Sequence, residues 1–237
     1  MKKTKDFLFK QFRVVQTHAT HKVGTDGVLL GAWVNVSGSK TILDVGTGSG
    51  LIALMIAQRT DETVIIDGID IQQADATQAK ENVLSSPWAG RINIHHASLQ
   101  SFVPEKKYDL IASNPPFFIN SYKPPKDNRS TVRHTETLPF TDLIAFSRKN
   151  LIPIGRLAVI LPTSEAERFS TIAHAHGLHL SRKCEFRSRA HKPVERWLME
   201  FSLEQSTQHN ESLTLHGHGE EWSEEYKILT KDFYIKI

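Results

Sequence analysis

Short apolar runs alternate with amphipathic stretches along most of this 237-residue chain. Seven runs have the length and composition of buried strands, at 41–45, 63–69, 91–95, 108–112, 156–161, 178–184 and 194–201. Helical spacing marks 51–58, 72–84, 138–151 and 163–176, with Thr141 as an N-cap and Gly177 as a left-handed cap. This alternation predicts a mostly parallel seven-stranded sheet with helices on both faces. The last two strands would form an antiparallel hairpin across a basic loop, 185–193.

The rest of the chain fits a single domain. Segment 216–225, rich in Gly, His and Glu, is typical of a loop, and the aromatic and apolar segment 226–237 is expected to dock on the body. With 39% apolar and 23% charged residues, the chain can bury a full core. We therefore expect one domain over 1–237, in which an N-terminal extension, 1–37, precedes the core, 38–237.

Composition also indicates where the protein works. No apolar run reaches the about 18 residues of a membrane span, and the lysines at the N-terminus precede no apolar signal core. The single Cys184 can form no intramolecular disulfide, which suits a reducing compartment, and no motif marks it as a nucleophile. We expect a cytoplasmic monomer without membrane contact.

The net charge of +3 is unevenly distributed. Residues 1–22 carry six Lys and Arg against one acid, and residues 181–200 carry six against three. Two such segments suit the phosphates of a nucleic acid, because bound cations release condensed counterions. Ordinary solvated faces explain the same charges equally well.

A glycine-rich turn lies between the first predicted strand and the first predicted helix, with Gly46, Gly48 and Gly50. Glycine at these positions lets the backbone approach a ligand closely. Asp70 ends the next strand, 20 residues after Gly50, where a carboxylate can accept both hydroxyls of a ribose. The spacing differs from that of dinucleotide sites, and Asp44 suits a cationic, amino-acid-bearing ligand. A methyl donor is favoured over NAD, and the alternative is a turn without a ligand.

A second turn, Asn114-Pro115-Pro116-Phe117, follows the run 108–112, at the edge where open α/β sheets bind ligands. The exocyclic amine of adenine is a poor nucleophile because its lone pair is delocalised into the ring. If the Asn114 side-chain oxygen and the Pro115 carbonyl accept its two hydrogens, the lone pair becomes available without a conventional base. The prolines rigidify the turn, and Phe117 can stack on the base. The alternative is a proline turn that only ends a strand.

Together, the two turns resemble those of class I methyltransferases, which use S-adenosylmethionine to modify adenine N6 in nucleic acids or glutamine N5 in proteins. Segments 21–33, 129–136 and 226–234 are similar to the bacterial tRNA1(Val) adenine-37 N6-methyltransferases. The resemblance spans nearly the whole chain. It implies a Rossmann-like class I α/β fold, S-adenosylmethionine as cofactor, tRNA as partner, and an extension 1–37 that borders the donor and RNA sites.

The motifs and the resemblance assign roles to particular residues. The expected catalytic residues are Asn114, Pro115, Pro116 and Phe117. The expected donor-binding residues are Thr25, Asp26, Asp44, Gly46, Thr47, Gly48, Gly50, Asp70, Ile71, Ser98 and Asn114. The expected RNA-binding residues are Phe117, Phe118, Arg129, Arg133, Arg187, Arg189 and Lys192. Ser98 departs from the family pattern, in which an acid often contacts the donor's adenine, although its hydroxyl can still accept a hydrogen bond.

Other functions stay open at this point. A glutamine methyltransferase of release factors shares the chemistry, but such enzymes carry a helical N-terminal domain and only about 40 residues precede the glycine turn here. A DNA enzyme is disfavoured because no recognition insertion is evident. A non-catalytic RNA-binding protein on the same scaffold is disfavoured by the intact motifs. No metal is expected, because the histidines lack the spacing of a known site.

Overall fold

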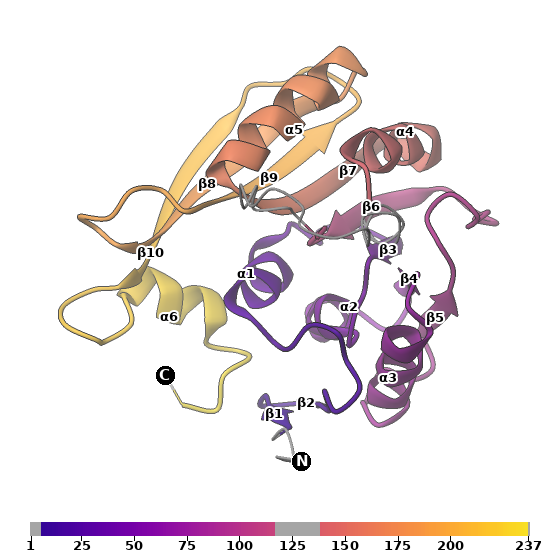
Figure 1. Cartoon of the computed structure of the whole chain (residues 1–237), viewed down its shortest axis with the longest axis horizontal. Coiled ribbons are helices and arrows are strands. Elements are labelled where there is room, and N and C mark those ends of the chain that lie inside the picture. The colour runs from indigo at the N-terminus through magenta and orange to yellow at the C-terminus, as the bar shows by residue number, and fades with distance from the viewer. Residues whose placement is uncertain (1–5, 117–137, 237) are drawn as a thin grey trace, which may run out of the picture.

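The computed structural model describes residues 6–116 and 138–236. One sheet of eight strands forms its centre, and β1 (Phe7–Leu8) pairs with β2 (Arg13–Val14) in a small separate hairpin (Figure 1). Across the large sheet the order is β10 (His209–His216), β8 (His179–Arg189), β9 (Arg196–Ser202), β7 (Leu151–Pro162), β6 (Tyr108–Ser113), β3 (Thr41–Val45), β4 (Ile65–Asp70) and β5 (Ile92–His96). Only β9 runs antiparallel to its neighbours. The expected class of fold, with a β8–β9 hairpin, is confirmed.

Two details of the predicted sheet are wrong. The sheet has eight strands rather than seven, because β10 adds in parallel to β8. Its sequence begins with four exposed polar residues, so no apolar run marks it. The expected loop 185–193 is strand as far as Arg189, since β8 pairs with β9 on one side and β10 on the other. In both places pairing between distant segments overrides a polar local sequence.

Helices cover both faces of the sheet, as expected. The helices on one side are α1 (Thr25–Trp33), α2 (Leu51–Gln58), α3 (Gln73–Leu84) and α6 (Glu224–Thr230), and those on the other are α4 (Phe140–Asn150) and α5 (Thr163–Ala175). Gly177 has φ 76° just after α5, so the predicted left-handed cap is confirmed. The N-cap of α4 is Pro139, and Thr141 lies inside the first turn. The predicted Thr141 cap is wrong because the helix begins one residue before it.

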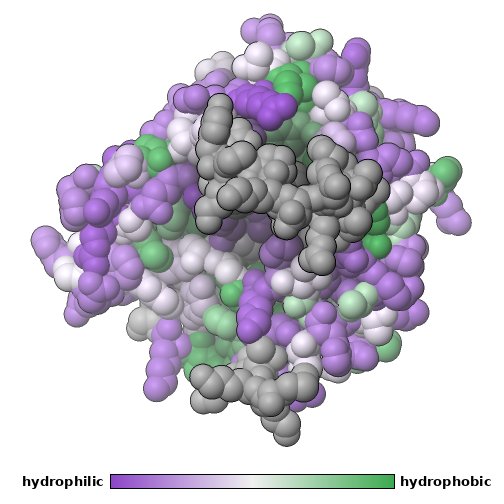
Figure 2. All heavy atoms as spheres, viewed as in Figure 1, coloured by the Kyte–Doolittle hydropathy of each residue, from purple (hydrophilic) through white to green (hydrophobic). Residues whose placement is uncertain are grey.

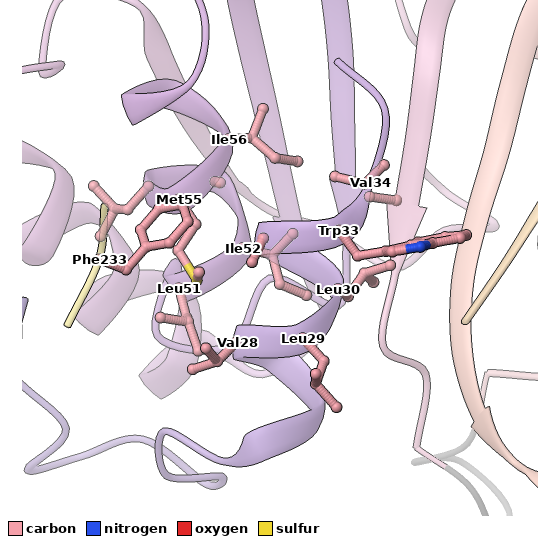
Figure 3. Packing of buried hydrophobic residues seen from close by; sticks show 14 of the residues in the cluster. Val28, Leu29, Leu30, Trp33, Val34, Leu51, Ile52, Met55, Ile56 and Phe233 are labelled. Carbon is pink, nitrogen blue, oxygen red and sulfur yellow. The ribbon is translucent and has the colours of Figure 1, made fainter. Parts of the chain in front are cut away.

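Helix α1 has no counterpart among the predicted elements. Seven of its nine residues are buried, so it has no polar face and no amphipathic period. It packs on α2 through Val28, Leu51, Met55 and their neighbours (Figure 3). A Cβ at Gly31 would lie 2.8 Å from the Met55 sulfur, so glycine is what allows this close approach.

The C-terminal segment docks on the body, as expected for its described residues. Phe9 and Tyr234 form an antiparallel bridge, and the Lys10 amide donates to the Phe233 carbonyl at 2.8 Å. Phe233 itself is 2% exposed and belongs to the core around α1 and α2. The two ends of the described chain therefore brace the face of the sheet that carries α1 (Figure 1).

Candidate active site

A cleft of about 1080 Å³ opens at the edge where the parallel strands end. Its walls come from segments that are far apart in sequence: residues 20–27, 45–49, 51–52, 69–72, 97–100, 114–116 and 138–139, with Asp75, Phe186, Ser188, Glu195, Arg196 and Leu215. One side holds the glycine turn, Asp70 and the start of α1, and we name it the donor side after its expected ligand. The other side holds Asn114 and the ends of β8, β9 and β10, and we name it the substrate side for the same reason. The cavity is large enough for a cofactor and part of a substrate.

The glycine turn of the donor side is held by its own hydrogen bonds. The amides of Gly46 and Thr47 both donate to the Ile69 carbonyl at 2.9 Å, and the Gly48 amide donates to Asp70 Oδ2 at 2.8 Å. Gly46, Gly48 and Gly50 have φ values of 70°, 55° and 83°, which disfavour any residue with a Cβ. A Cβ at Gly46 or Gly48 would meet nothing within 4 Å, so the turn presents bare backbone to open space.

Asp44 lies beneath this turn and does not line the cleft, because its side chain is completely buried. Its Oδ2 accepts from the Thr47 hydroxyl at 2.7 Å and from the Ala53 amide at 3.2 Å. Its Oδ1 has no hydrogen-bond partner among the described residues. Burial raises the pKa of Asp44 from 3.8 to about 7, against the lowering effect of the Thr47 and Ala53 bonds.

Asp70 ends β4 and lines the cleft. Its two oxygens accept from the Gly48 amide at 2.8 Å and the Gln72 amide at 2.9 Å, and each oxygen keeps a further lone pair. Burial raises the pKa of Asp70, while the two amide bonds and the nearby His21 lower it. A carboxylate held in this way is oriented before any ligand arrives.

Asn114 is the polar side chain at the centre of the substrate side. Ser113, the last residue of β6, donates from its hydroxyl to the Val45 carbonyl at 2.8 Å and so joins the ends of β6 and β3. Asn114 follows immediately, and its Oδ1 is buried without a partner among the described residues. Pro115 is buried next to it, and Pro116 is exposed; all three line the cleft. The turn therefore holds an unpaired acceptor on a residue that lines the cavity.

The remaining expected donor-binding residues all line the cleft: Thr25, Asp26, Thr47, Ile71 and Ser98. Asp26 accepts from Arg196 Nε at 3.0 Å, which ties the start of α1 to the start of β9. The Ser98 hydroxyl donates to the Ser101 hydroxyl at 2.9 Å and accepts from its amide at 3.2 Å.

Two of the expected RNA-binding residues, Arg187 and Arg189, lie on β8 and do not line the cleft. Along β8, Phe186 and Ser188 line the cavity, whereas Arg187 and Arg189 alternate with them and face the other way. Arg187 pairs with Glu185 at 3.8 Å, and Arg189 pairs with Glu220. Lys192 lies in the exposed loop after β8. Hydrophilic residues cover most of the projection at the left of Figure 2. Phe117, Phe118, Arg129 and Arg133 lie outside the described residues.

Several residues in the cleft or directly behind its walls carried no signal in the sequence. Arg196 lies among other basic residues of β8 and β9, and only the fold brings it beside Asp26. Three polar residues of α3, Asp75, Gln78 and Asn82, are buried against segment 15–20. Their spacing of three and four residues marks one helical face, but a polar face is ordinarily taken as solvated.

Two further observations concern partners. Among the residues with a described position, no three His, Cys, Asp or Glu side chains come together as a metal site. No helix in the same parts of the chain has the length and apolar character needed to cross a bilayer.

Comparison with known proteins finds methyltransferases at the level of family, sequence and fold. Residues 14–164 match the family model of the methyltransferase small domain. The tRNA1(Val) (adenine(37)-N6)-methyltransferases of Parabacteroides distasonis and Escherichia coli are 45% and 38% identical, covering 98% and 97% of this chain and 98% and 94% of their own. A predicted O-methyltransferase structure from Agrobacterium tumefaciens, 17% identical, aligns with a TM-score of 0.66 over 88% of this chain and 96% of its own.

The fold and the cleft define a class I methyltransferase that uses S-adenosylmethionine. A glycopeptide N-methyltransferase solved with that donor shares the fold, with a TM-score of 0.56 over 77% of this chain and 100% of its own, at 12% identity. The particular family follows from identity along nearly the whole length. The chain belongs to the tRNA1(Val) (adenine(37)-N6)-methyltransferases.

The donor side fits S-adenosylmethionine on its own geometry. The bare backbone at Gly46 and Gly48 leaves space where any side chain would stand. Asp70 has free lone pairs that suit the two hydroxyls of a ribose, and the carboxylates of Asp26 and Asp70 suit a ligand that carries positive charge. These residues are the ones we expect to hold the donor.

Proposed function

We propose that this chain transfers a methyl group from S-adenosylmethionine to N6 of adenine 37 in tRNA1(Val). Relatives named for that activity are 38–45% identical to it over 97–98% of its length. The observation in the structure that supports the chemistry most directly is the buried, unpartnered Oδ1 of Asn114 at the cleft, a statement that covers the described residues.

An unpaired buried acceptor ordinarily destabilises a protein, so a substrate that supplies the missing hydrogen explains it. The amine of adenine has two N–H groups. Asn114 Oδ1 would accept one and the Pro115 carbonyl the other, which draws the nitrogen toward a tetrahedral geometry with a localised lone pair. The bound donor supplies an electrophilic methyl group on a sulfonium. Asn114 and Pro115 would stabilise charge that develops on the amine as its lone pair takes the methyl group, with the neutral thioether of S-adenosylhomocysteine as the leaving group. The methylated amine would then lose one proton to solvent, so no general base is required.

The single-stranded anticodon loop suits such a site. A base beside the anticodon can leave the loop at little unpairing cost and enter a pocket, where an aromatic side chain stacks on it. On the family resemblance alone, we assign this stacking to Phe117 and assign RNA contacts to Phe118, Arg129 and Arg133. Phe186 and Leu215 give the substrate side an apolar wall of its own.

We further propose that the β8–β9 loop contacts the RNA backbone, chiefly through Lys192. Arg187 and Arg189 can contribute after exchanging Glu185 and Glu220 for phosphate, and such surface ion pairs are weak. The partner is tRNA and the expected compartment is the cytoplasm.

The test uses methyl-labelled S-adenosylmethionine and tRNA1(Val) transcripts that differ only at position 37, followed by nucleoside mass spectrometry. We expect N6-methyladenosine from the transcript with adenine 37 and none from a transcript with guanine there. Methylation of both transcripts would place the target base elsewhere. Labelling of a release factor and of neither RNA would replace the proposal with a protein glutamine methyltransferase. Donor binding without any product would favour the non-catalytic alternative.

A further inference from the structure

Residues 15–24 form a strap that crosses α3 and enters α1. The strap is held through its backbone: the amides of Val15, His18 and Thr20 donate to the side chains of Asn82, Gln78 and Asp75, at 2.9, 3.3 and 2.7 Å. These bonds follow one line along the helix, so the strap runs against α3.

The side chains that bind the strap form a buried polar stripe on α3. Asp75, Gln78 and Asn82 are 3%, 1% and 2% exposed. Polar groups at such depth lose their hydration, and apolar residues would pack there without that cost. The amides of the strap compensate for it, because each supplies a hydrogen-bond donor to the stripe. The stripe therefore recognises the backbone of the strap.

Asn82 does more than hold the strap. Its Nδ2 donates both to the Val15 carbonyl at 2.8 Å and to the Ser49 carbonyl at 2.9 Å, and Ser49 belongs to the glycine turn. A Cβ at Gly50 would lie 3.4 Å from the Cβ of Ala79, so α3 also packs closely on the end of that turn. One amide thus joins the strap to the glycine turn.

Both segments that Asn82 joins are walls of the cleft. The strap contributes residues 20–24, and the turn contributes residues 46–49. Within the strap, His21 lies near enough to Asp70 to lower the pKa of that carboxyl. Neither Asn82 nor Gln78 lines the cavity. Asn82 and Gln78 can therefore affect a bound ligand only through the positions of the strap and the glycine turn.

We propose that Asn82 and Gln78 are positioning residues that set the affinity for S-adenosylmethionine by holding the strap and the glycine turn as one preformed wall. The inference rests on the proposed function only in its choice of donor. When Asn82 is truncated, the amide and carbonyl of Val15 and the carbonyl of Ser49 lose their partner. The strap must then be ordered when the donor binds, which weakens binding.

The experiment compares Asn82→Ala, Asn82→Asp and Gln78→Ala with Thr77→Ala, an exposed position on the same helix. Calorimetry without RNA measures the Kd for S-adenosylmethionine. We expect Asn82→Ala to raise Kd about tenfold or more, the loss expected for buried groups left unpaired. Asn82→Asp keeps the acceptor for the Val15 amide but places a carboxylate oxygen against the Val15 and Ser49 carbonyls, so its Kd should rise at least as far. Thr77→Ala should match the wild-type protein.

Two further measurements separate positioning from general destabilisation. Trypsin should cut after Lys22 faster in Asn82→Ala, and the donor should slow that cut. With tRNA present, KM for the donor should rise while kcat at saturating donor stays within about twofold, as expected when only ground-state binding is lost. Faster cleavage with an unchanged donor Kd would overturn the proposal, as would equal losses in Kd and kcat. If Asn82→Ala does not fold, Gln78→Ala decides, because it removes a single bond to the strap and otherwise only a bond to Glu81 on the same helix.

Failure of this proposal and failure of the proposed function are distinguishable. Donor binding and proteolysis are measured without RNA, so they do not depend on which molecule is methylated. A protein that methylates no tRNA but loses donor affinity on Asn82→Ala keeps the positioning role and loses the assigned substrate. If the protein methylates adenine 37 and Asn82→Ala leaves the donor affinity unchanged, the assigned substrate is kept and the positioning role is lost.

Discussion

The two sides of the cleft treat their polar groups in opposite ways. On the donor side, Gly48, Asp70 and Gln72 bind one another, and the strap is tied to α3. On the substrate side, Asn114 Oδ1 is buried without a partner among the described residues. Among the residues that line the cleft, Asp70 is therefore already paired before any ligand arrives, whereas the proposed function leaves the Asn114 acceptor to be paired by the substrate. Removing a polar group from the donor side should therefore weaken donor binding, and removing one from the substrate side should lower kcat.

The largest expected effect is on catalysis. Asn114→Ala should lower kcat by about 10²- to 10³-fold, the usual consequence of deleting a group that stabilises the transition state. The Kd for S-adenosylmethionine should stay within about twofold, because this acceptor serves the amine. Single-turnover methylation and calorimetry measure the two quantities. Asn93→Ala, an exposed position on β5, is the matched control. Loss of donor binding equal to the loss of rate would remove the distinction between the two sides.

A smaller effect is expected on the donor side. Asp70→Ala removes the acceptor for two amides of the cleft wall, so the donor Kd should rise about 10- to 100-fold. The control is Asp67→Ala on the same strand, whose carboxylate binds the Tyr108 hydroxyl at 2.9 Å away from the cleft. That variant should lower the free energy of unfolding and leave donor affinity unchanged. Equal donor affinities for the two variants would contradict the assignment of Asp70.

The pH dependence of stability tests the burial of the Asp44 carboxyl beneath the glycine turn. Because the pKa of Asp44 rises to about 7 on folding, the folded chain binds this proton more tightly than the unfolded chain. The stabilising contribution is complete below about pH 4 and is lost as pH rises through about 7. Asp44→Asn cannot ionise and should gain stability relative to the wild-type protein across that range. Urea unfolding at acidic and alkaline pH measures the difference, and a difference independent of pH would contradict it.

The smallest effects are expected outside the cleft, on tRNA binding. Lys192 takes part in no ion pair among the described residues, whereas Arg187 and Arg189 must first leave Glu185 and Glu220. Lys192→Ala should weaken tRNA binding a few-fold and lower its salt slope by about 1. The double variant Arg187→Ala, Arg189→Ala should change the slope less. Filter binding across a salt series measures both, and the opposite ranking would show that the arginines make the main phosphate contacts.

Much of the fold could be predicted because its signals are local. The runs that became β3, β4, β5 and β6 are short and apolar, and the parallel order follows from the helices between them. Elements without such signals were missed. Helix α1 is buried all round and has no period, and β10 begins with exposed polar residues that only its pairing with β8 makes a strand.

Some features of the site could likewise be predicted from the sequence, and others could not. The glycine turn, Asp70 and the Asn114 turn each end a strand, and parallel strands end at one edge, so their meeting in one cleft followed from the pattern. The directions of the side chains on β8 could not be predicted from that pattern. Strand alternation turns Phe186 and Ser188 into the cleft and Arg187 and Arg189 away from it, and RNA binding by these two arginines stays a prediction.

The class of fold, the two turns and the chemistry that they can support were predictable from local patterns, because strand and turn preferences act over a few residues. Three features became evident only in the folded chain: Asp44 lies beneath the turn, Arg196 reaches Asp26, and Asn82 joins the strap to the glycine turn. Each of these depends on burial or on contact between distant segments, and neither is encoded in the spacing of neighbouring residues.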